Sequence, residues 1–535
     1  MVVPELRPWR AARPQVERIA KAVRPRLARA GAAAKPRVAR LTRALRPGFP
    51  ALHPPRPGAV RTWQYTAGAA TVGLALAAGV VTAAGPWGAD GQRTAERDRA
   101  VALERSGGAD HGRSGTAPGR PRPVPSAGPV LAGLDGPSRA AGTETAEPDG
   151  KALSEALEPL LDASALGGSH AAAVVDVATG KRLYAADAGE ALTPASTTKI
   201  ATATAALSAL GPDHRFTTRA AFEPDTGELV LVGGGDPTLT ARKKTNGWAG
   251  LRDLAADTAK ALEKRGIHKV TLSYDTTLYS GPALHPIGVN DNLAPVSALS
   301  ADEGRTDDTT SGPAPRVSDP AEDAAAKFAD FLDSAGITTT PPGPSKATTR
   351  AETLATVSSP PLSDLVERML TNSDNDIAEA LARQTALASG EPGSFDGGAR
   401  AISARLTKLG LPMSGASFHD GSGLDRDDRL TPDLLTALLV TAGDPDRPGL
   451  RPVLTGLPVA GFTGTLADRY TDSAAGVIRA KTGTLTGVNT LAGTVVDADG
   501  RLLAFAFMAS GTTDPVEAES ALDKTATALA GCGCR

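Results

Sequence analysis

The sequence predicts an α+β fold in which a smaller α/β unit is inserted into a larger domain, preceded by one transmembrane helix and a linker. Hairpin patterns open and close the part of the chain after residue 150, with helical patterns between them. A separate alternation of strand and helix patterns fills the middle of that part, whereas the first 150 residues show no pattern of a packed core. We therefore expect a main domain over 151–215 and 356–535, interrupted by an inserted α/β domain over 216–355.

The composition is that of a globular protein. Of the 535 residues, 41% are hydrophobic and 22% are charged, which excludes collagen, a coiled coil and a wholly disordered chain. The only cysteines are Cys532 and Cys534, so the sequence provides neither a disulfide scaffold nor a Cys/His zinc site. We expect no metal and no cofactor.

The net charge of -2 conceals an asymmetry along the chain. Residues 1–61 carry 15 Lys and Arg against two acidic residues, which leaves 42 basic and 57 acidic residues in the remainder. A nucleic-acid-binding domain needs a basic face. The charge balance therefore argues against nucleic acid as a partner of the main body, and we expect 1–61 to be a basic, disordered cytoplasmic tail.

One segment has the length of a membrane span. Residues 62–89 contain no charged residue over 28 positions, enough at about 1.5 Å per residue to cross a hydrocarbon core of about 30 Å. Trp63, Tyr65 and Trp87 lie near its ends, as interfacial aromatic residues do. Because the basic residues precede the span, the positive-inside rule places everything after residue 89 outside the cytoplasm.

We interpret this span as an uncleaved signal anchor in the cell membrane. A cleaved signal peptide and a buried core helix are the alternatives, but the basic region is far longer than a signal peptide's usual total of about 15–30 residues. Residues 90–150 contain 7 Pro and 11 Gly and form the predicted linker. As a flexible coil, this linker has a root-mean-square span of about 45 Å.

The main domain is expected to open with a helix and a hairpin, followed by a second helix. Leucines recur at helical spacing over 153–161, and residues 171–186 predict two strands around an Ala-Thr-Gly-Lys turn. Pro194 then precedes a segment rich in helix formers that ends at Gly211, with its larger apolar residues on one side. This places Ser196 and Lys199 in the first turn of that helix.

The remaining elements follow from the same signals. In the insertion we expect a hairpin around 225–227, helices near 251–265 and 320–335, and a strand over 268–274. After the insertion we expect helices on both sides of Ser373, a strand over 477–481, a hairpin closed by Asp499-Gly500, and a helix over 515–529.

Three short motifs occur in a fixed order. They are Ser196-Thr197-Thr198-Lys199, Ser373-Asp374-Asn375 and Lys481-Thr482-Gly483, and each is the only match of its type. One S-x-x-K is expected about once by chance in a chain of this size, whereas all three in order have a chance rate of roughly one in a hundred. The conjunction, rather than any single motif, is therefore the signal.

The residue types in these motifs suit nucleophilic catalysis. A serine hydroxyl is a weak nucleophile until a base takes its proton. At positions i and i+3 of a helix, Ser196 and Lys199 lie on one face, and the helix N-terminus presents N–H groups to a developing oxyanion. Lys199 can act as the base only if burial and a nearby cation, for which Lys481 is the candidate, lower its pKa. Ser373 would pass the proton to the leaving amine, and Asn375 would hydrogen-bond a substrate amide.

The third motif is expected to bind a carboxylate. Lys481, Thr482 and Thr484 would do so from the edge of a strand. Taken one at a time, each motif has a purely structural explanation, as a polar residue at a helix start, a helix cap or a solvated lysine. No folding requirement places all three in this order, so together they predict a catalytic site.

These motifs form the signature of the penicillin-recognising serine enzymes. More narrowly, TPASTTKIATA, LVGGGDPTL, APVSALS, TNSDNDIAE, DGSGLDR and AKTGTLTG resemble the D-alanyl-D-alanine carboxypeptidase/endopeptidase family, the class C low-molecular-mass penicillin-binding proteins, over about residues 155–530. The resemblance implies a serine β-lactamase/DD-peptidase-like transpeptidase fold, with an antiparallel sheet flanked by helices. It also implies a serine-type D-Ala-D-Ala carboxypeptidase/endopeptidase that acts on peptidoglycan stem peptides and is inhibited by β-lactams, and the sequence leaves the balance between the two activities open.

The resemblance assigns roles to individual residues. It implies that Ser196 is the acylated nucleophile, that Lys199 is its base, and that Ser373 and Asn375 form a second wall of the site. It implies a third, substrate-binding wall made of Lys481, Thr482, Gly483 and Thr484. Backbone N–H groups of Ser196 and Thr484 would form the oxyanion hole.

Three alternatives stay open at this point. A serine β-lactamase shares the motifs, although no E-x-x-L-N sequence is present to position a class A deacylating glutamate. A catalytically silent, peptidoglycan-binding relative would be expected to have lost a motif. A triad of His419, Asp420 and Ser422 is disfavoured because neighbours in a turn-rich loop cannot converge, so we expect His419 to be an exposed loop residue.

Overall fold

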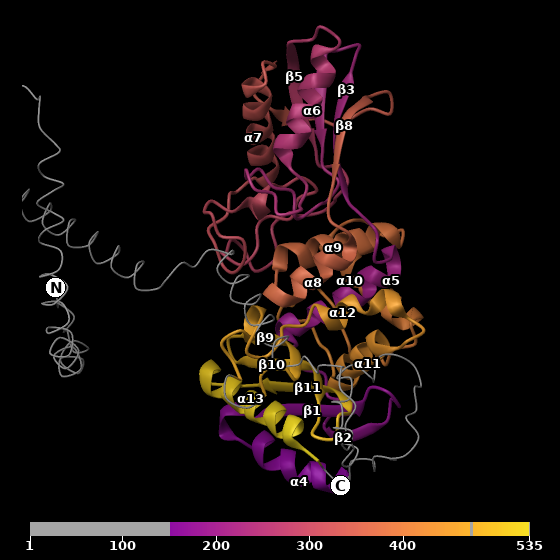
Figure 1. Cartoon of the computed structure of the whole chain (residues 1–535), viewed down its shortest axis with the longest axis vertical. Helices are drawn as coiled ribbons and strands as arrows, with labels where there is room; N and C mark the ends of the chain where they lie inside the picture. The colour runs from indigo at the N-terminus through magenta and orange to yellow at the C-terminus, as the bar shows by residue number, and fades with distance from the viewer. Residues whose placement is uncertain (1–149, 471–473, 534–535) are drawn as a thin grey trace, which may run out of the picture. The chain divides into compact units, whose positions relative to one another are not determined.

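The computed structural model describes residues 150–470 and 474–533, whose elements are labelled in Figure 1. The predicted tail over 1–61, the predicted span over 62–89 and nearly all of the predicted linker lie outside these residues. Among the described residues, none of the helices combines the length and the apolar composition that crossing a membrane requires.

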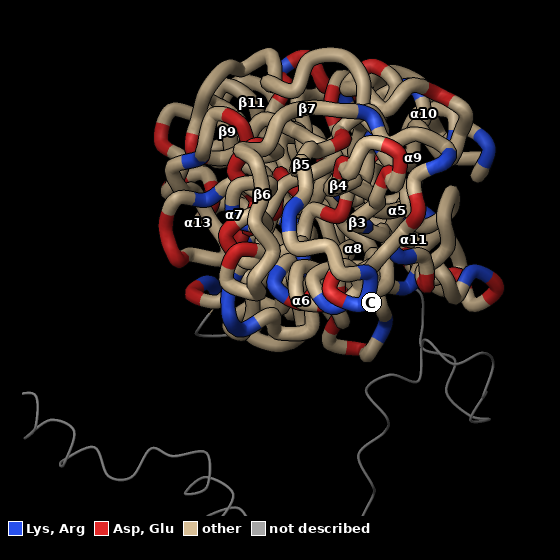
Figure 2. Tube along the Cα trace, turned by 90° about the horizontal axis from the view of Figure 1, so that it is seen from above, with Lys and Arg blue, Asp and Glu red and all other residues tan. Residues whose placement is uncertain are grey.

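Charged side chains of both signs are distributed over the described part of the chain. In Figure 2, segments with Lys or Arg and segments with Asp or Glu are interspersed along the tube. Some form surface pairs, such as Arg400 with Glu391 at 2.9 Å.

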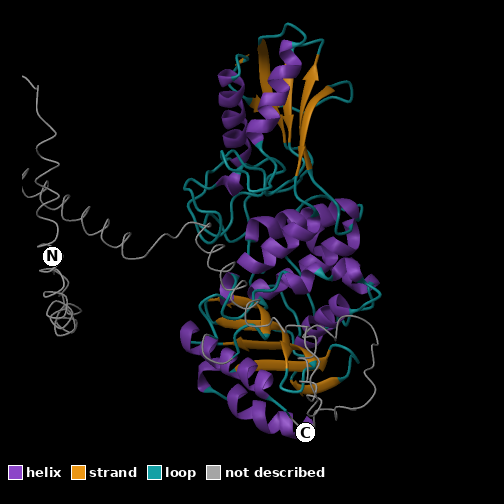
Figure 3. Ribbon diagram, viewed as in Figure 1, coloured by secondary structure: helices purple, strands orange, loops and turns teal. Residues whose placement is uncertain are grey.

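A five-stranded antiparallel sheet forms one end of the described structure (Figure 3). Its strand order is β2-β1-β11-β10-β9, so a strand from the start of the domain pairs with a strand from its end. The bounds are β1 (Ser169–Asp176), β2 (Arg182–Ala186), β9 (Ile478–Leu485), β10 (Val488–Val496) and β11 (Leu502–Ser510). Both predicted hairpins are present, and the predicted strand over 477–481 is β9, which continues through the whole third motif.

Alternation along the strands divides the core of this domain in two. Phe505 and Phe507 of β11 pack on one face against α4 (Gly150–Leu161) and α13 (Pro515–Gly531). Ala504 and Ala506 point to the other face, where a larger helical cluster lies. Because side chains alternate across a strand, one strand serves both cores. The short side chains lie on the face that must admit a closely packed helix.

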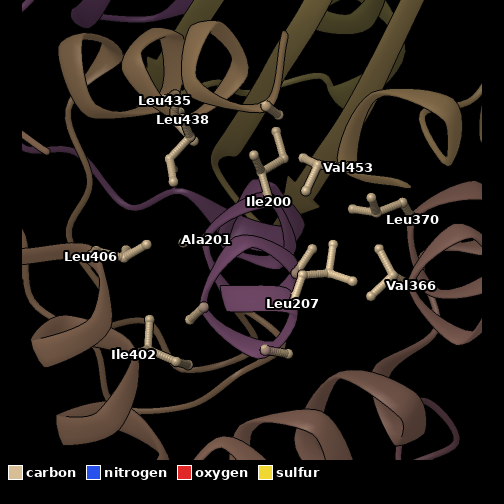
Figure 4. Packing of buried hydrophobic residues seen from close by; sticks show 14 of the residues in the cluster. Ile200, Ala201, Leu207, Val366, Leu370, Ile402, Leu406, Leu435, Leu438 and Val453 are labelled. Atoms are coloured by element: carbon tan, nitrogen blue, oxygen red, sulfur yellow. The ribbon is translucent and has the colours of Figure 1, made fainter. Parts of the chain in front are cut away.

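That helix is α5 (Thr198–Leu210), which lies at the centre of the second cluster. In Figure 4, α5 is surrounded by labelled side chains of neighbouring helices, namely Val366, Leu370, Ile402, Leu406, Leu435, Leu438 and Val453. Every residue of α5 from Thr198 to Leu207 is buried, so the sequence-based expectation of one apolar side was too narrow. A helix rich in Ala and Thr can be enclosed on all sides because small side chains let its neighbours approach.

The helices that surround α5 come from the second half of the chain. Their bounds are α8 (Leu362–Asn372), α9 (Asn375–Ala388), α10 (Phe395–Lys408), α11 (Pro432–Gly443) and α12 (Pro452–Thr455). The prediction of helices on both sides of Ser373 is confirmed by α8 and α9. The predicted helix over 515–529 is α13.

A second sheet lies at the other end of the described structure, with α6 and α7 beside it (Figure 1). Its order is β6-β5-β4-β3-β8, with β7 also paired to β5, and the pairing of β4 with β5 is parallel. The elements are β3 (Thr217–Glu223), β4 (Glu228–Val232), α6 (Leu251–Glu263), β5 (Lys269–Asp275), α7 (Pro320–Ser334), β6 (Thr338–Thr339), β7 (Gly343–Pro344) and β8 (Glu352–Ser358). Its own apolar core includes Leu229, Leu231 and Phe328. The long connection from β5 to α7 returns toward α9 and supplies part of the site described below.

Candidate active site

Ser196 lies at the N-terminal end of the buried helix. It is in a 3-10 turn, η2 (Ala195–Thr197), that continues directly into α5, so Lys199 occupies the first turn of the α-helix. The preceding residue, Ala195, has a φ of 49°, in the left-handed region that costs a residue with a Cβ about 1–2 kcal/mol. Such strain persists only where the surrounding structure holds it, and it is common at functional sites.

Two glycines allow the backbone before Ser196 to take this path. Gly423 has a φ of +80°, and a Cβ there would lie 1.9 Å from the carbonyl oxygen of Ala195. A Cβ on Gly483 would lie 2.7 Å from the carbonyl oxygen of Pro194 and 2.2 Å from the hydroxyl of Thr490. Close packing therefore explains why the third motif has a glycine at position 483, because strand β9 must touch the turn that carries Ser196.

The second motif forms the junction between α8 and α9. Ser373 takes a left-handed conformation (φ 57°) just after α8 ends, and its N–H bonds to the carbonyl of Met369. Asp374 then caps α9 by accepting a hydrogen bond from the N–H of Ile377 at 3.0 Å. Asn375 is the first residue of α9. The sharp reversal turns the Ser373 and Asn375 side chains toward Lys481 and Lys199, respectively.

The third motif lies on β9, the edge strand of the five-stranded sheet, as predicted. The Thr482 hydroxyl lies 3.0 Å from that of Thr465, and the Thr484 hydroxyl donates to Glu519 of α13 at 3.0 Å. Lys481 is fully buried. Its Nζ lies 2.9 Å from Ser373 Oγ and 2.7 Å from the carbonyl oxygen of Thr482.

Three contacts of the Lys199 amine show how its neutral form could accept a proton from Ser196. Its Nζ lies 2.7 Å from Asn375 Oδ1, 2.7 Å from the carbonyl oxygen of Ser422 and 2.9 Å from Ser196 Oγ. The first two partners can only accept hydrogen bonds, whereas a hydroxyl can also donate. A neutral amine has two N–H groups and one lone pair, so this arrangement directs the lone pair of neutral Lys199 at the Ser196 proton.

Burial makes the neutral form of Lys199 accessible. The side chain is 0% exposed, and the resulting desolvation lowers its pKa from 10.5 to about 8. Negative charges on Asp420, Glu379, Asp374 and Asp428 oppose this shift. Near neutral pH, Lys199 is therefore poised between proton acceptor and proton donor.

Lys481 provides a second buried amine close to the first. Desolvation, and then the positive charge of Lys199, hold the pKa of Lys481 well below its usual range. Each amine lies 2.9 Å from a serine oxygen, Ser196 for Lys199 and Ser373 for Lys481. This arrangement can deliver a proton to a group bound between the two serines.

The long connection of the inserted unit holds the second motif in place. The Asn375 amide nitrogen donates to the carbonyl of Asn292 at 3.0 Å, which fixes the orientation of that amide toward Lys199. Asp376 accepts from the N–H of Ala294 at 3.0 Å and pairs with Arg316 at 3.0 Å. The insertion therefore contributes residues that position the second motif of the site.

A cavity of about 350 Å³ opens at the meeting point of these elements. Among the sequence-predicted residues, its lining includes Ser196, Ser373, Asn375, Thr482 and Thr484. Lys199, Lys481 and Gly483 are not on its surface, because they lie buried behind it. The structure thus brings all eight predicted residues together: five line the cavity, and three lie buried next to it.

The alternative triad does not form. The His419 side chain is 46% exposed and lies 3.6 Å from Asp428, while the hydroxyl of buried Ser422 donates to Asp420 at 3.1 Å. The expectation that His419 is an exposed loop residue agrees with this placement. Asp420 instead meets a histidine from the insertion, His285, at 3.0 Å.

Sequence reasoning missed the buried charges beneath the site. Glu379 follows Asn375 by four residues, so both lie on one face of α9, yet Glu379 is fully buried. A charged residue on the inner face of a helix next to a catalytic motif was the signal that could have identified it. Two groups could in principle offer metal ligands, namely His285 with Glu379 and Asp420, and Glu303 with Asp374 and Asp376.

Internal donors already meet both groups. Backbone N–H groups of residues 421–423 bond to Glu379 and Asp420, while Arg305 and Arg316 pair with Glu303 and Asp376. In the first group these contacts use carboxylate oxygens that a cation would require, whereas in the second group Asp374 Oδ2 is buried without a hydrogen-bond partner.

Comparison with known proteins identifies relatives over the described region. The D-Ala-D-Ala carboxypeptidase 3 (S13) family matches residues 153–315 and 307–529. A carboxypeptidase of Mycobacterium tuberculosis is 38% identical over 382 residues, covering 69% of this chain and 81% of its own. The carboxypeptidase DacB of Mycolicibacterium smegmatis is 39% identical over 376 residues, covering 68% and 80%.

Solved structures show the same fold. Penicillin binding protein 4 of Haemophilus influenzae superposes with a TM-score of 0.56 at 23% identity, covering 70% of this chain and 97% of that one. The same protein in complex with a β-lactam gives a TM-score of 0.54. The prediction of a mixed α+β fold of the DD-peptidase type is therefore confirmed for the described residues.

Proposed function

The chain belongs to the D-Ala-D-Ala carboxypeptidase 3 (S13) family and is a serine-type D-Ala-D-Ala carboxypeptidase, and from that premise we propose how its residues perform the reaction. The observation that carries the proposal is the placement of Lys199 Nζ, 2.9 Å from Ser196 Oγ and held there by two groups that only accept hydrogen bonds. The substrate is a peptidoglycan stem peptide that ends in D-Ala-D-Ala.

Acylation begins when Ser196 loses its proton to neutral Lys199. The Ser196 oxygen attacks the carbonyl carbon of the penultimate D-alanine, and negative charge develops on the carbonyl oxygen. We assign the backbone N–H groups of Ser196 and Thr484 to this oxyanion, since both residues line the cavity. Asn375 is placed to hydrogen-bond the peptide while its oxygen holds Lys199.

Collapse of the tetrahedral intermediate breaks the C–N bond to the terminal D-alanine. The leaving amine needs a proton, and Ser373 can donate one because its hydroxyl is replenished by Lys481 at 2.9 Å. The terminal carboxylate lies along β9, where Thr482 and Thr484 face the cavity. Lys199 then releases the proton it took from Ser196, which replaces the proton given up by Lys481, and is neutral again. Water attacks the Ser196 ester, Lys199 takes a proton from the water and returns it to the Ser196 oxygen as the ester bond breaks, and the shortened peptide leaves.

The same attack on a β-lactam carbonyl gives a Ser196 ester whose leaving amine stays tethered. This accounts for inhibition by β-lactams, and it fits the β-lactam complex solved for penicillin binding protein 4. The simplest test of the proposed function is release of D-alanine from a soluble peptide that ends in D-Ala-D-Ala. We expect the enzyme to release D-alanine and β-lactams to block this release. A folded preparation that releases no D-alanine would contradict the proposal.

We also propose that residues 62–89 anchor the enzyme in the cell membrane with residues 1–61 in the cytoplasm. The uncharged segment of 28 residues, its aromatic ends and the basic tail support this proposal. The catalytic domain then acts outside the membrane, where peptidoglycan lies, at the end of the linker over 90–150. Full-length protein is expected in the membrane fraction, and deletion of 62–89 should remove it from that fraction. Full-length protein that stays soluble would contradict the anchor.

A further inference from the structure

A buried network of charged side chains lies directly beneath Lys199. It consists of Glu379 from α9, Asp420 from the loop after α10, and His285 from the insertion. All three are buried, and none of them lines the catalytic cavity. The reaction as described above uses none of them, so their presence needs a separate explanation.

Glu379 and Asp420 hold one short piece of backbone. Glu379 Oε1 accepts from the N–H groups of Gly421 at 3.1 Å and Ser422 at 2.8 Å. Asp420 Oδ1 accepts from the N–H of Gly423 at 2.6 Å. The Ser422 carbonyl and the Gly423 N–H belong to one planar peptide group and point in opposite directions, so Asp420 turns this carbonyl toward Lys199, which it meets at 2.7 Å. Glu379 fixes the preceding peptide group through the Ser422 N–H, which also lies 3.1 Å from Asp420 Oδ1.

The position of the imidazole is also fixed. His285 Nδ1 lies 3.2 Å from the N–H of Ile287, which can only donate, so Nδ1 is the acceptor and the hydrogen lies on Nε2. Nε2 therefore donates to Asp420 Oδ2 at 3.0 Å. The ring of Phe395 packs edge-on against His285 with centroids 5.1 Å apart. Asp420 thus stays ionised, and burial together with the Asp420 charge raises the pKa of Glu379 to about 7.

We propose that Glu379 is a positioning residue of the carboxypeptidase reaction: together with Asp420 it fixes the backbone of residues 421–423 that presents the Ser422 carbonyl to Lys199, and its charge sets the pH range in which Lys199 accepts the proton of Ser196. This inference rests on the proposal that Lys199 is the base. The charged groups that face Lys199 are Asp420, Glu379, Asp374, Asp428 and, with opposite sign, Lys481. Those that face Glu379 are Asp420, His285, Lys199 and, one turn along α9, Arg383.

The sign of the effect follows from electrostatics. A negative Glu379 favours the protonated amine of Lys199, so its removal lets Lys199 become neutral at lower pH. Glu379→Gln keeps an oxygen that can accept from Gly421 and Ser422 but removes the charge. We expect the acid limb of the pH profile for β-lactam acylation to move down by about one pH unit. The plateau rate should change by less than about threefold, because the carbonyl stays in place.

A second variant separates positioning from charge. Glu379→Asp keeps the charge but is one methylene too short to reach both N–H groups. We expect its acid limb to stay at the wild-type pH while its plateau rate falls by about tenfold. If Glu379→Gln does not fold, this variant still tests the proposal, because an unchanged plateau would contradict the positioning role. Glu391→Gln, a change at a partly exposed residue beyond the end of α9 that pairs with Arg400, is the matched control and should alter neither quantity.

The outcome distinguishes this inference from the proposed function. A merely structural role for Glu379 would lower the melting temperature and the yield of active enzyme but leave the acid limb where it is. If folded Glu379→Gln keeps the acid limb of its acylation pH profile at the wild-type pH, the inference is therefore wrong. Acylation that persists unchanged in Lys199→Met would instead overturn the assignment of the base, on which the inference depends.

Discussion

Ser196→Ala is expected to abolish both release of D-alanine and labelling by a fluorescent penicillin, with a loss of at least about 10³-fold in each. Among the described residues, Ser196 Oγ is the hydroxyl that Lys199 meets, whereas Ser373 Oγ lies against Lys481 and Ser422 Oγ is turned toward Asp420. The fold should persist, since Lys199 keeps its hydrogen bonds to Asn375 and Ser422. Melting temperature and both activities should be measured on the same preparation.

A matched serine variant controls for damage to the helix. Ser208→Ala lies further along α5, where the hydroxyl bonds only to the carbonyl of Ala205 at 2.9 Å. It is expected to leave labelling and hydrolysis at the wild-type level. Residual penicillin labelling of Ser196→Ala would show that the nucleophile is another residue, and the assignment of the site would then be wrong.

Lys199→Met is expected to lower the acylation rate by about 10²–10⁴-fold, the usual contribution of a general base. Methionine has a similar length and suits a fully buried site, although it leaves the carbonyl of Ser422 and the amide oxygen of Asn375 without a donor. Each lost partner costs about 1–3 kcal/mol of the free energy of unfolding, so the variant should be less stable but folded.

The pH dependence of acylation supports this assignment independently. Because the pKa of Lys199 is lowered to about 8, the fraction of neutral amine, and with it the wild-type rate, should rise with pH and reach half its maximum near pH 8. This limb should be absent from the remaining activity of Lys199→Met. Lys327→Met, which removes a lysine paired with Asp323 on α7, is the control and should keep the wild-type profile. An unchanged limb in Lys199→Met would assign it to another group.

Much of the fold could be predicted because local signals and tertiary structure agree. Gly211 ends α5, the Asp499-Gly500 turn joins β10 to β11, and leucines at helical spacing form the buried side of α4. The environment of α5 could not be predicted in this way. Its Ala and Thr residues carry little periodic signal, and only the arrival of five helices from the second half of the chain encloses it.

The candidate site shows the same division. Its eight predicted residues lie together because each motif has a fixed local geometry: a helix start, a left-handed junction and an edge strand. The supporting residues come from distant segments whose meeting no local pattern records. Asn292 reaches Asn375 across 83 positions, and His285 reaches Asp420 across 135. Long-range contacts of this kind depend on how the insertion folds back onto α9.

The central claim, that Ser196 is the acylated nucleophile of a D-Ala-D-Ala carboxypeptidase, is tested most directly by mass spectrometry. The purified full-length chain is mixed with benzylpenicillin, its intact mass is followed over time, and the modified peptide is mapped. We predict one long-lived adduct on Ser196. Rapid loss of the adduct with consumption of the drug would show a β-lactamase instead, and an adduct on another residue, or none, would contradict the claim.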